Sequence, residues 1–142
     1  MTKIIMTAHG ELSSALLYSV GMIAGQQDPE QVAAVNFYPN DSLDTLKDRL
    51  EEQIKKFDPE NNHIIVFCDL KSGSPFNASV ILSKTYSNLT IVHGMNLPML
   101  LEIILMKDMY ASKEDLIPVV EMCKETVGVH VEKEIRRGRR DV

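Results

Sequence analysis

The chain has 142 residues, of which 44% are hydrophobic and 25% are charged, and its formal net charge is -5 at pH 7. This length and composition predict a single globular domain, and two cysteines are too few for a disulfide scaffold. No apolar run approaches the roughly 20 residues that cross a bilayer, and no secretory leader precedes the first apolar run, so we expect a cytoplasmic protein.

Positive charge is concentrated at the end of the chain. Residues 136–142 hold four arginines and one aspartate, a net charge of +3, which leaves -8 on residues 1–135. An acidic body argues against a nucleic-acid surface. We interpret 1–135 as one folded domain and 136–142 as a basic, frayed tail, although such a tail could also contact RNA or an acidic partner.

The first half of the chain alternates apolar runs with helical patterns. The pattern predicts a strand, a helix, a second strand and a second helix over residues 3–8, 11–26, 33–37 and 43–57. The second helix is the more clearly amphipathic of the two, and either Asp41 or Ser42 can cap it.

The second half of the chain continues the alternation. The pattern predicts a strand, a helix, a strand, two helices and a last strand over residues 63–68, 75–83, 89–92, 97–108, 113–127 and 129–135. The run 63–68 is β-branched and apolar after His63, as in a central parallel strand. Ser112 and Asp115 offer a capping box, and Pro118 should kink or restart its helix. The alternating segment 129–135 suits an edge strand.

This order predicts a doubly wound, three-layer α/β/α sandwich. Its sheet is expected to hold four mainly parallel strands, with an additional antiparallel strand at one edge. The helix at 97–108 is apolar almost all round, so we expect it to be buried on several sides, with a subunit interface as a natural place for it. Ligands of such folds bind beyond the carboxyl ends of the strands, at a topological switch point.

Polar residues follow three of the predicted strands. His9 and Gly10 follow the first strand, Asp69 follows the third and His93 follows the fourth. If the first and third strands are neighbours, Asp69 can accept a hydrogen bond from one ring nitrogen of His9. That bond fixes the tautomer and leaves the other nitrogen as a nucleophile.

A serine-rich turn follows Asp69. Ser74 is predicted to cap a helix that has Pro75 at its first position, and free N–H groups at a helix start suit phosphate. Ser72 and Ser74 add hydroxyl donors, and Gly73 lets the backbone approach closely. These residues indicate a site where His9 holds a phosphoryl group.

Other residues near these strand ends are weaker candidates. Gly10, His93 and Asn96 are predicted to line the site, although Asn96 stands beside Pro98, as turn residues often do. A metal module using His9, Asp69 and His93 is a rival interpretation, but no paired-ligand spacing supports it. We therefore expect no metal.

Three blocks of sequence, in order, resemble one family. They are Thr7-Ala8-His9-Gly10, the run from Asp69 to Ala78 and the run from Gly94 to Glu102. Together they resemble the mannose-type A component (EIIA) of the phosphoenolpyruvate-dependent sugar phosphotransferase system (PTS), over about residues 3–127. Two positions depart from the family pattern. Ser72 stands where a glycine is frequent and adds a side chain beside the phosphate, and Ala8 also replaces a frequent glycine.

The resemblance implies a phosphotransferase. His9 would accept a phosphoryl group from the phosphocarrier HPr and pass it to a separate B component (EIIB), with Asp69 orienting His9 and Ser74 holding the phosphoryl group. It also implies a homodimer in the cytoplasm that works with membrane C and D components (EIIC and EIID), without a metal or organic cofactor. Residues 129–135 could supply the family's antiparallel edge strand and exchange it between subunits.

Other interpretations of the same residues remain open. The A domain of the dihydroxyacetone-kinase phosphocarrier would also use His9. A response-regulator receiver needs an acidic pair after its first strand, where this chain has Thr7-Ala8-His9. A hydrolase with Ser72 or Ser74 as its nucleophile lacks the Gly-x-Ser-x-Gly elbow. A regulatory protein remains possible if His9 is inert.

Overall fold

The computed structural model describes residues 1–132. Strands and helices alternate along the chain, as predicted. The elements are β1 (Thr2–His9), α1 (Leu12–Ala24), β2 (Val32–Phe37), α2 (Leu43–Lys56), β3 (His63–Cys68), α3 (Ser74–Ser83), β4 (Leu89–His93), α4 (Leu97–Leu105) and α5 (Lys113–Cys123), with 3-10 turns at Lys107–Met109 and Lys124–Thr126.

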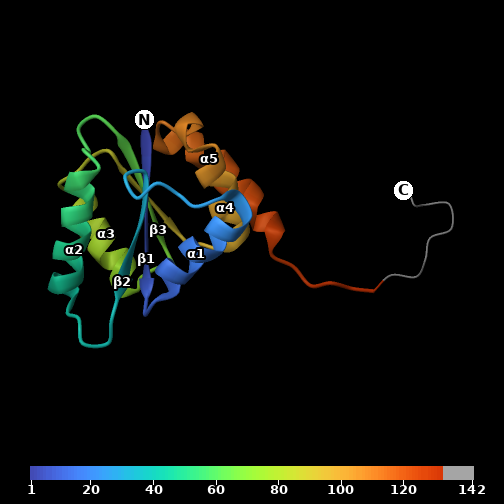
Figure 1. The fold of residues 1–142 in the computed structure, drawn as a ribbon, viewed down its shortest axis with the longest axis horizontal. Helices are drawn as coiled ribbons and strands as arrows, with labels where there is room; N and C mark the ends of the chain where they lie inside the picture. Colours follow the sequence, from blue (N-terminus) through green and yellow to red (C-terminus); the bar gives the residue numbers. More distant parts are fainter. Residues whose placement is uncertain (133–142) are drawn as a thin grey trace.

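The four strands form one parallel sheet in the order β2-β1-β3-β4. The chain leaves β1 for β2 on one side and later crosses to β3 on the other, so the switch point lies at the carboxyl ends of β1 and β3. Helices α2 and α3 cover one face of the sheet, and α1, α4 and α5 cover the other (Figure 1). The predicted α/β/α sandwich is confirmed, and the first and third strands are neighbours in the sheet.

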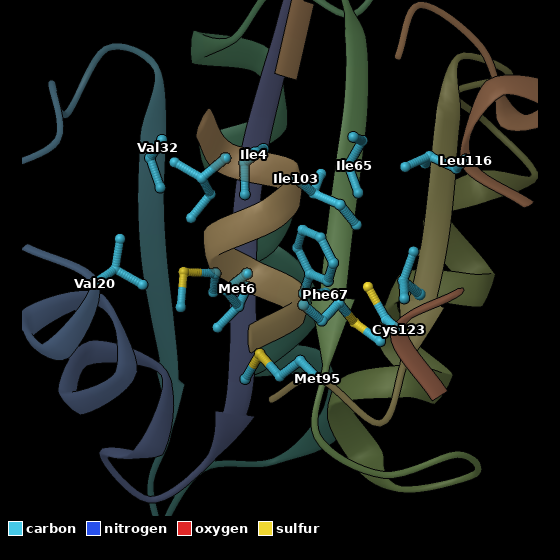
Figure 2. Close-up of a cluster of buried hydrophobic side chains, with 14 of the residues drawn as sticks. Ile4, Met6, Val20, Val32, Ile65, Phe67, Met95, Ile103, Leu116 and Cys123 are labelled. Atoms are coloured by element: carbon cyan, nitrogen blue, oxygen red, sulfur yellow. The ribbon is translucent and has the colours of Figure 1, made fainter. Parts of the chain in front are cut away.

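Each face of the sheet has its own apolar core. Ile4 and Met6 of β1 pack with Phe67 of β3 and Ile103 of α4 on one face (Figure 2). Ile5 belongs to the cluster on the opposite face, which includes residues of α2 and α3. Because side chains alternate along a strand, His9 falls on the same face as Ile5, the face that α3 covers.

The helix ends match the predictions in part. Ser42 caps α2, since its Oγ accepts a hydrogen bond from the Thr45 N–H at 3.0 Å. The prediction that Ser74 caps α3 is wrong by one residue, because Gly73 occupies the N-cap and Ser74 is the first helical residue. Helix α5 runs through Pro118 as a single helix. Asp115 Oδ2 accepts from the Ala111 N–H and the Ser112 hydroxyl, so the capping box is not formed.

The described part of the predicted edge strand, residues 129–132, does not form a strand. Residues 129–132 form no regular structure, are exposed, and lead away from the body of the domain (Figure 1). A strand needs the N–H and C=O groups of a neighbour, and these four residues do not run along β4. Residues 133–135 and the basic tail at 136–142 lie outside the described part of the chain. Within residues 1–132, no helix is long and apolar enough to span a membrane.

Candidate phosphoryl-transfer site

His9 and Asp69 are in direct contact at the carboxyl ends of β1 and β3. Asp69 Oδ2 lies 2.8 Å from His9 Nδ1 and also accepts the His9 backbone N–H at 3.1 Å. An ionised carboxylate only accepts hydrogen bonds, so this contact assigns the proton of a neutral His9 to Nδ1. The His9 side chain is 45% exposed, whereas that of Asp69 is only 11% exposed. The lone pair of Nε2 is therefore left for chemistry.

Asp69 is held in its ionised form by its hydrogen bonds. Burial by itself would raise the pKa of this carboxyl group. The bonds from the His9 ring and backbone, together with the Leu70 N–H at 2.9 Å from Oδ1, outweigh burial and lower the pKa below its usual value. At neutral pH, Asp69 is consequently a fixed negative charge beside Nδ1.

Gly73 brings the start of α3 against the His9 ring. A β-carbon at this position would lie 3.0 Å from His9 Cε1 and 3.8 Å from Nε2. The backbone of Gly73 is extended, with φ of -84°, so conformation does not demand a glycine here. What requires it is the close approach of the imidazole.

The two serines of the turn have different environments. Ser72 is exposed and has a φ of +70°, the left-handed region that favours glycine. Its carbonyl accepts a hydrogen bond from the Asn77 side-chain amide at 3.3 Å. Ser74 is half-buried in the first turn of α3. The Ser74 and Phe76 N–H groups have no carbonyl partner within the helix at these positions, so they are free to meet an anion.

Phe37, at the end of β2, also borders the site, and the sequence did not single it out. Its ring meets the His9 ring edge-on, with 5.7 Å between centroids and 75° between planes. Its carbonyl accepts the N–H of Gly10 at 2.7 Å, which ties the end of β2 to the turn after His9. Gly10 has a φ of +61°, as this sharp turn into α1 requires. The position of Phe37 at a strand end was the available signal, but an aromatic residue there is typical of a core.

Two of the weaker candidates have other contacts. Asn96 caps α4, because its Oδ1 accepts the Met99 N–H at 3.0 Å. The His93 ring meets Phe76 edge-on at 5.9 Å, and both His93 and Asn96 line a groove between β4 and α5. Among residues 1–132, no hydrogen bond joins either side chain to His9 or Asp69.

Cys68 and Cys123 are buried thiols that form no disulfide. Burial raises the pKa of Cys68 to about 12, so this residue, next to Asp69, is not a nucleophile at neutral pH. Within the described residues, no group of three or more histidine, cysteine or acidic side chains could hold a metal ion.

A parallel α/β sandwich with a carboxylate-bound histidine at its switch point offers a nucleophilic ring nitrogen beside a helix start that suits phosphate. Residues 3–120 match the family model described as "PTS system fructose IIA component". The chain belongs to this family of sugar phosphotransferase IIA components, and the resemblance found in the sequence is confirmed.

Relatives with different sugar names are similar to this chain. It is 29% identical to the fructose-specific EIIA component of Bacillus subtilis, over 94% of this chain and 91% of that protein. It is 30% identical to the mannose-specific EIIAB component of Escherichia coli, over 87% of this chain but only 38% of that protein. The mannose/sorbose-specific IIA subunit of Enterococcus faecalis has the same fold, with a TM-score of 0.83, 25% identity, and coverage of 95% of this chain and 98% of that one.

Proposed function

We propose that this protein accepts a phosphoryl group from phospho-HPr on Nε2 of His9 and transfers it to a separate B component. The observation that carries the proposal is the contact between His9 Nδ1 and Asp69, which leaves Nε2 as the nucleophilic atom beside the start of α3. The established role of the family, phosphotransfer within the sugar PTS, supports the same assignment.

The transfer forms one bond and breaks one. The lone pair of Nε2 bonds to phosphorus, and the bond between phosphorus and the donor breaks with its electron pair staying on the donor. The ring then carries the phosphoryl group on Nε2 and a proton on Nδ1, so it gains positive charge. The Asp69 carboxylate at 2.8 Å stabilises that charge. Transfer to the B component runs the same steps in reverse, with His9 as the leaving group.

The N–H groups of Ser74 and Phe76 are proposed to bind the phosphoryl oxygens. They stand at the positive end of the α3 dipole, next to the ring that would carry the group. The Ser74 hydroxyl is the additional donor, and the Ser72–Gly73 backbone forms the floor of this cradle. No metal or organic cofactor takes part in the proposed steps.

The function is tested by incubating wild type and His9→Ala with labelled phosphoenolpyruvate, enzyme I and HPr, and measuring the label on each protein. The wild type should gain a label that is acid-labile and base-stable, as a phosphoramidate is, and His9→Ala should gain none. Circular dichroism should show that His9→Ala keeps its fold, since the side chain is half-exposed. A label on His9→Ala, or none on wild type, would refute the proposal.

We further infer that the protein is a cytoplasmic homodimer in which residues 129–135 of one copy add to β4 of the other. Within the described residues, β4 is an edge strand with no partner on its outer side. A groove of about 590 Å³ runs along it, lined by Ile91, Leu116 and Val120 among others. The alternating segment that begins at Val129 has the pattern of an antiparallel edge strand, and it leaves its own domain.

The dimer is tested by sedimentation of the full chain and of a chain ending at Gly128. The full chain should sediment as a dimer, and the shortened chain should be monomeric while still accepting phosphate. A shortened chain that stays dimeric would show that residues 129–135 do not hold the two subunits together. The membrane C and D components are proposed to work with this protein only indirectly, and the phosphoryl group is proposed to pass from the B component to the mannose-family sugar that is taken up.

A further inference from the structure

We propose that Phe37 is a positioning residue for His9. Its ring contacts the imidazole, which the backbone of Gly73 also approaches closely and which Asp69 holds at Nδ1. The contact is edge-on, at 5.7 Å and 75°, which is the favourable geometry for two aromatic rings. The kinetic part of this inference rests on the proposed phosphoryl transfer, whereas the structural part concerns the ring of unphosphorylated His9.

A single hydrogen bond does not fix an imidazole. The bond to Asp69 anchors Nδ1, but the ring can still rock about that point, and Nε2 lies on the moving side. Gly73 limits this motion on one side, since even a β-carbon there would approach Cε1 to 3.0 Å. Phe37 limits it on another side. The transfer needs Nε2 in line with the phosphorus, so this restraint acts on the reacting atom.

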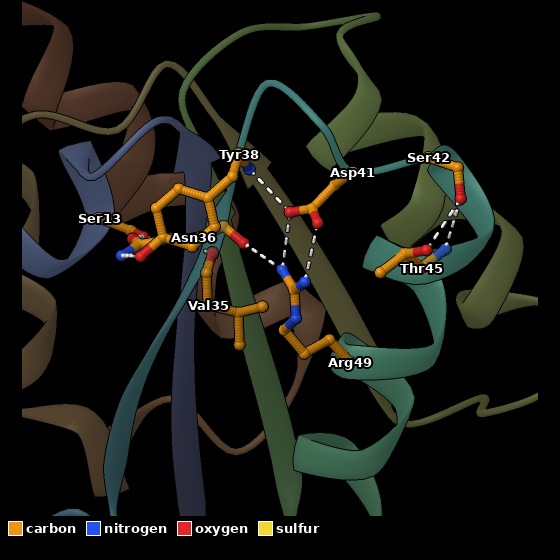
Figure 3. A network of polar contacts seen from close by, with 8 residues as sticks. All are labelled: Ser13, Val35, Asn36, Tyr38, Asp41, Ser42, Thr45 and Arg49. Atoms are coloured by element: carbon orange, nitrogen blue, oxygen red, sulfur yellow. Dashed lines mark hydrogen bonds and ion pairs between the residues drawn. The ribbon is translucent and has the colours of Figure 1, made fainter.

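The polypeptide around Phe37 is itself held in place. On one side of it, the Asn36 carbonyl accepts a hydrogen bond from Arg49 Nη1 at 2.8 Å. On the other side, the Tyr38 N–H donates to Asp41 Oδ2 at 2.8 Å. Arg49 and Asp41 are joined by two hydrogen bonds of 3.0 Å, so one planar ion pair binds the residues on both sides of Phe37 (Figure 3).

Helix α1 holds the same segment from its other side. The Ser13 hydroxyl donates to Asn36 Oδ1 at 2.7 Å, and the Asn36 amide donates to Ser14 Oγ at 3.1 Å and to the Tyr38 hydroxyl at 3.0 Å. Helices α1 and α2 and the loop residue Asp41 therefore all contact the segment from Asn36 to Tyr38. These contacts hold the backbone on both sides of Phe37, and with it the ring that meets His9.

The test replaces Phe37 by leucine, which keeps apolar volume but removes the ring edge, and by tyrosine, which keeps the ring. Phe57→Leu is the matched control, since Phe57 is buried in the core on the same face of the sheet, at the end of α2 far from His9. Single-turnover transfer from phospho-HPr gives the limiting rate and the half-saturating concentration separately. Nitrogen-15 NMR of the His9 ring, by the position and width of its signals, reports how firmly the ring is held in the unphosphorylated protein.

Phe37→Leu should lower the limiting rate roughly tenfold while leaving the half-saturating concentration unchanged, because alignment and not binding is lost. The His9 ring signals should shift and broaden, because the ring then moves about its Nδ1 anchor while Asp69 keeps the tautomer. Phe37→Tyr and Phe57→Leu should stay close to wild type in both measurements.

Two results would overturn the assignment. One is a Phe37→Leu protein with wild-type His9 signals, and the other is a loss of rate that Phe57→Leu shares. If wild type accepts no phosphoryl group, the proposed function fails. The NMR comparison still decides whether Phe37 positions the ring.

Discussion

Replacing Gly73 by alanine tests the close approach between α3 and His9. The new β-carbon would lie 3.0 Å from His9 Cε1, closer than the 3.4 Å or more of an ordinary contact. Its distance to Leu70 Cβ, 3.6 Å, would be ordinary. Either the ring or the helix start must therefore move by a few tenths of an ångström. Because His9 is half-exposed, the ring is the part that gives way, and Nε2 moves with it. We expect transfer from phospho-HPr to fall by roughly tenfold or more.

Stability should change less than activity. Gly73 is the N-cap of α3, where alanine is a poorer residue, so unfolding in urea should show a loss of about 1 kcal/mol. Gly73→Ser separates the two effects, since serine is a good cap but carries the same β-carbon. It should recover the stability and remain slow in transfer.

Gly21→Ala is the matched control for the added methyl group. Gly21 lies within α1, and a β-carbon there would make only an ordinary contact at 3.8 Å. Alanine should therefore stabilise that helix slightly and leave transfer unchanged. A Gly73→Ser protein that transfers at the wild-type rate would refute the steric argument.

Three further changes test other parts of the site. Ser72→Gly should raise the free energy of unfolding by about 1 kcal/mol and keep transfer, since Ser72 has a φ of +70°. Asn96→Ala should cost about 1 kcal/mol in urea unfolding with little effect on transfer, because Asn96 caps α4. The stability that ionised Asp69 adds should be present above about pH 4 and lost as the pH falls through its lowered pKa. In Asp69→Asn, the free energy of unfolding should therefore fall less on acidification than in the wild type. The same variant should transfer more slowly at neutral pH.

The strands and their alternation with helices along the chain were predictable, because the hydrophobic pattern that marks each element is local in the sequence. The run His63–Cys68 is apolar at every position after His63, and all six residues are buried in the structure. The alternation of strands and helices predicts a parallel sheet, and the structure shows that β1 and β3 are neighbours in it. The carboxyl ends of these two strands then lie at one edge of the sheet, which allows His9 and Asp69 to meet, as predicted for that case.

The rest of the site depends on approaches between distant segments. The sequence places Gly73 in a turn, but only the position of the His9 ring shows why a side chain does not fit there. Phe37 has the pattern of a core residue, and its contact with His9 arises from where β2 ends. Asn96 follows a strand on the ligand edge, yet its oxygen is used by the start of α4.

The segment at 129–135 shows a different limit. Its alternation predicts a strand, but a strand also needs a neighbouring segment to pair with, and residues 129–132 pair with none in the described part of the chain. Residues 129–132 accordingly have no regular structure in the single chain. A partner copy is the proposed source of the missing neighbour.

Phosphorus-31 and nitrogen-15 NMR of the phosphorylated protein test the central claim most directly. Asp69 occupies Nδ1, so the account predicts a single phosphohistidine, at His9, with the phosphoryl group on Nε2. The phosphohistidine signal should be absent in His9→Ala and should disappear when the wild-type sample is acidified. A phosphoryl group on Nδ1 of His9, or on any other residue, would contradict the account.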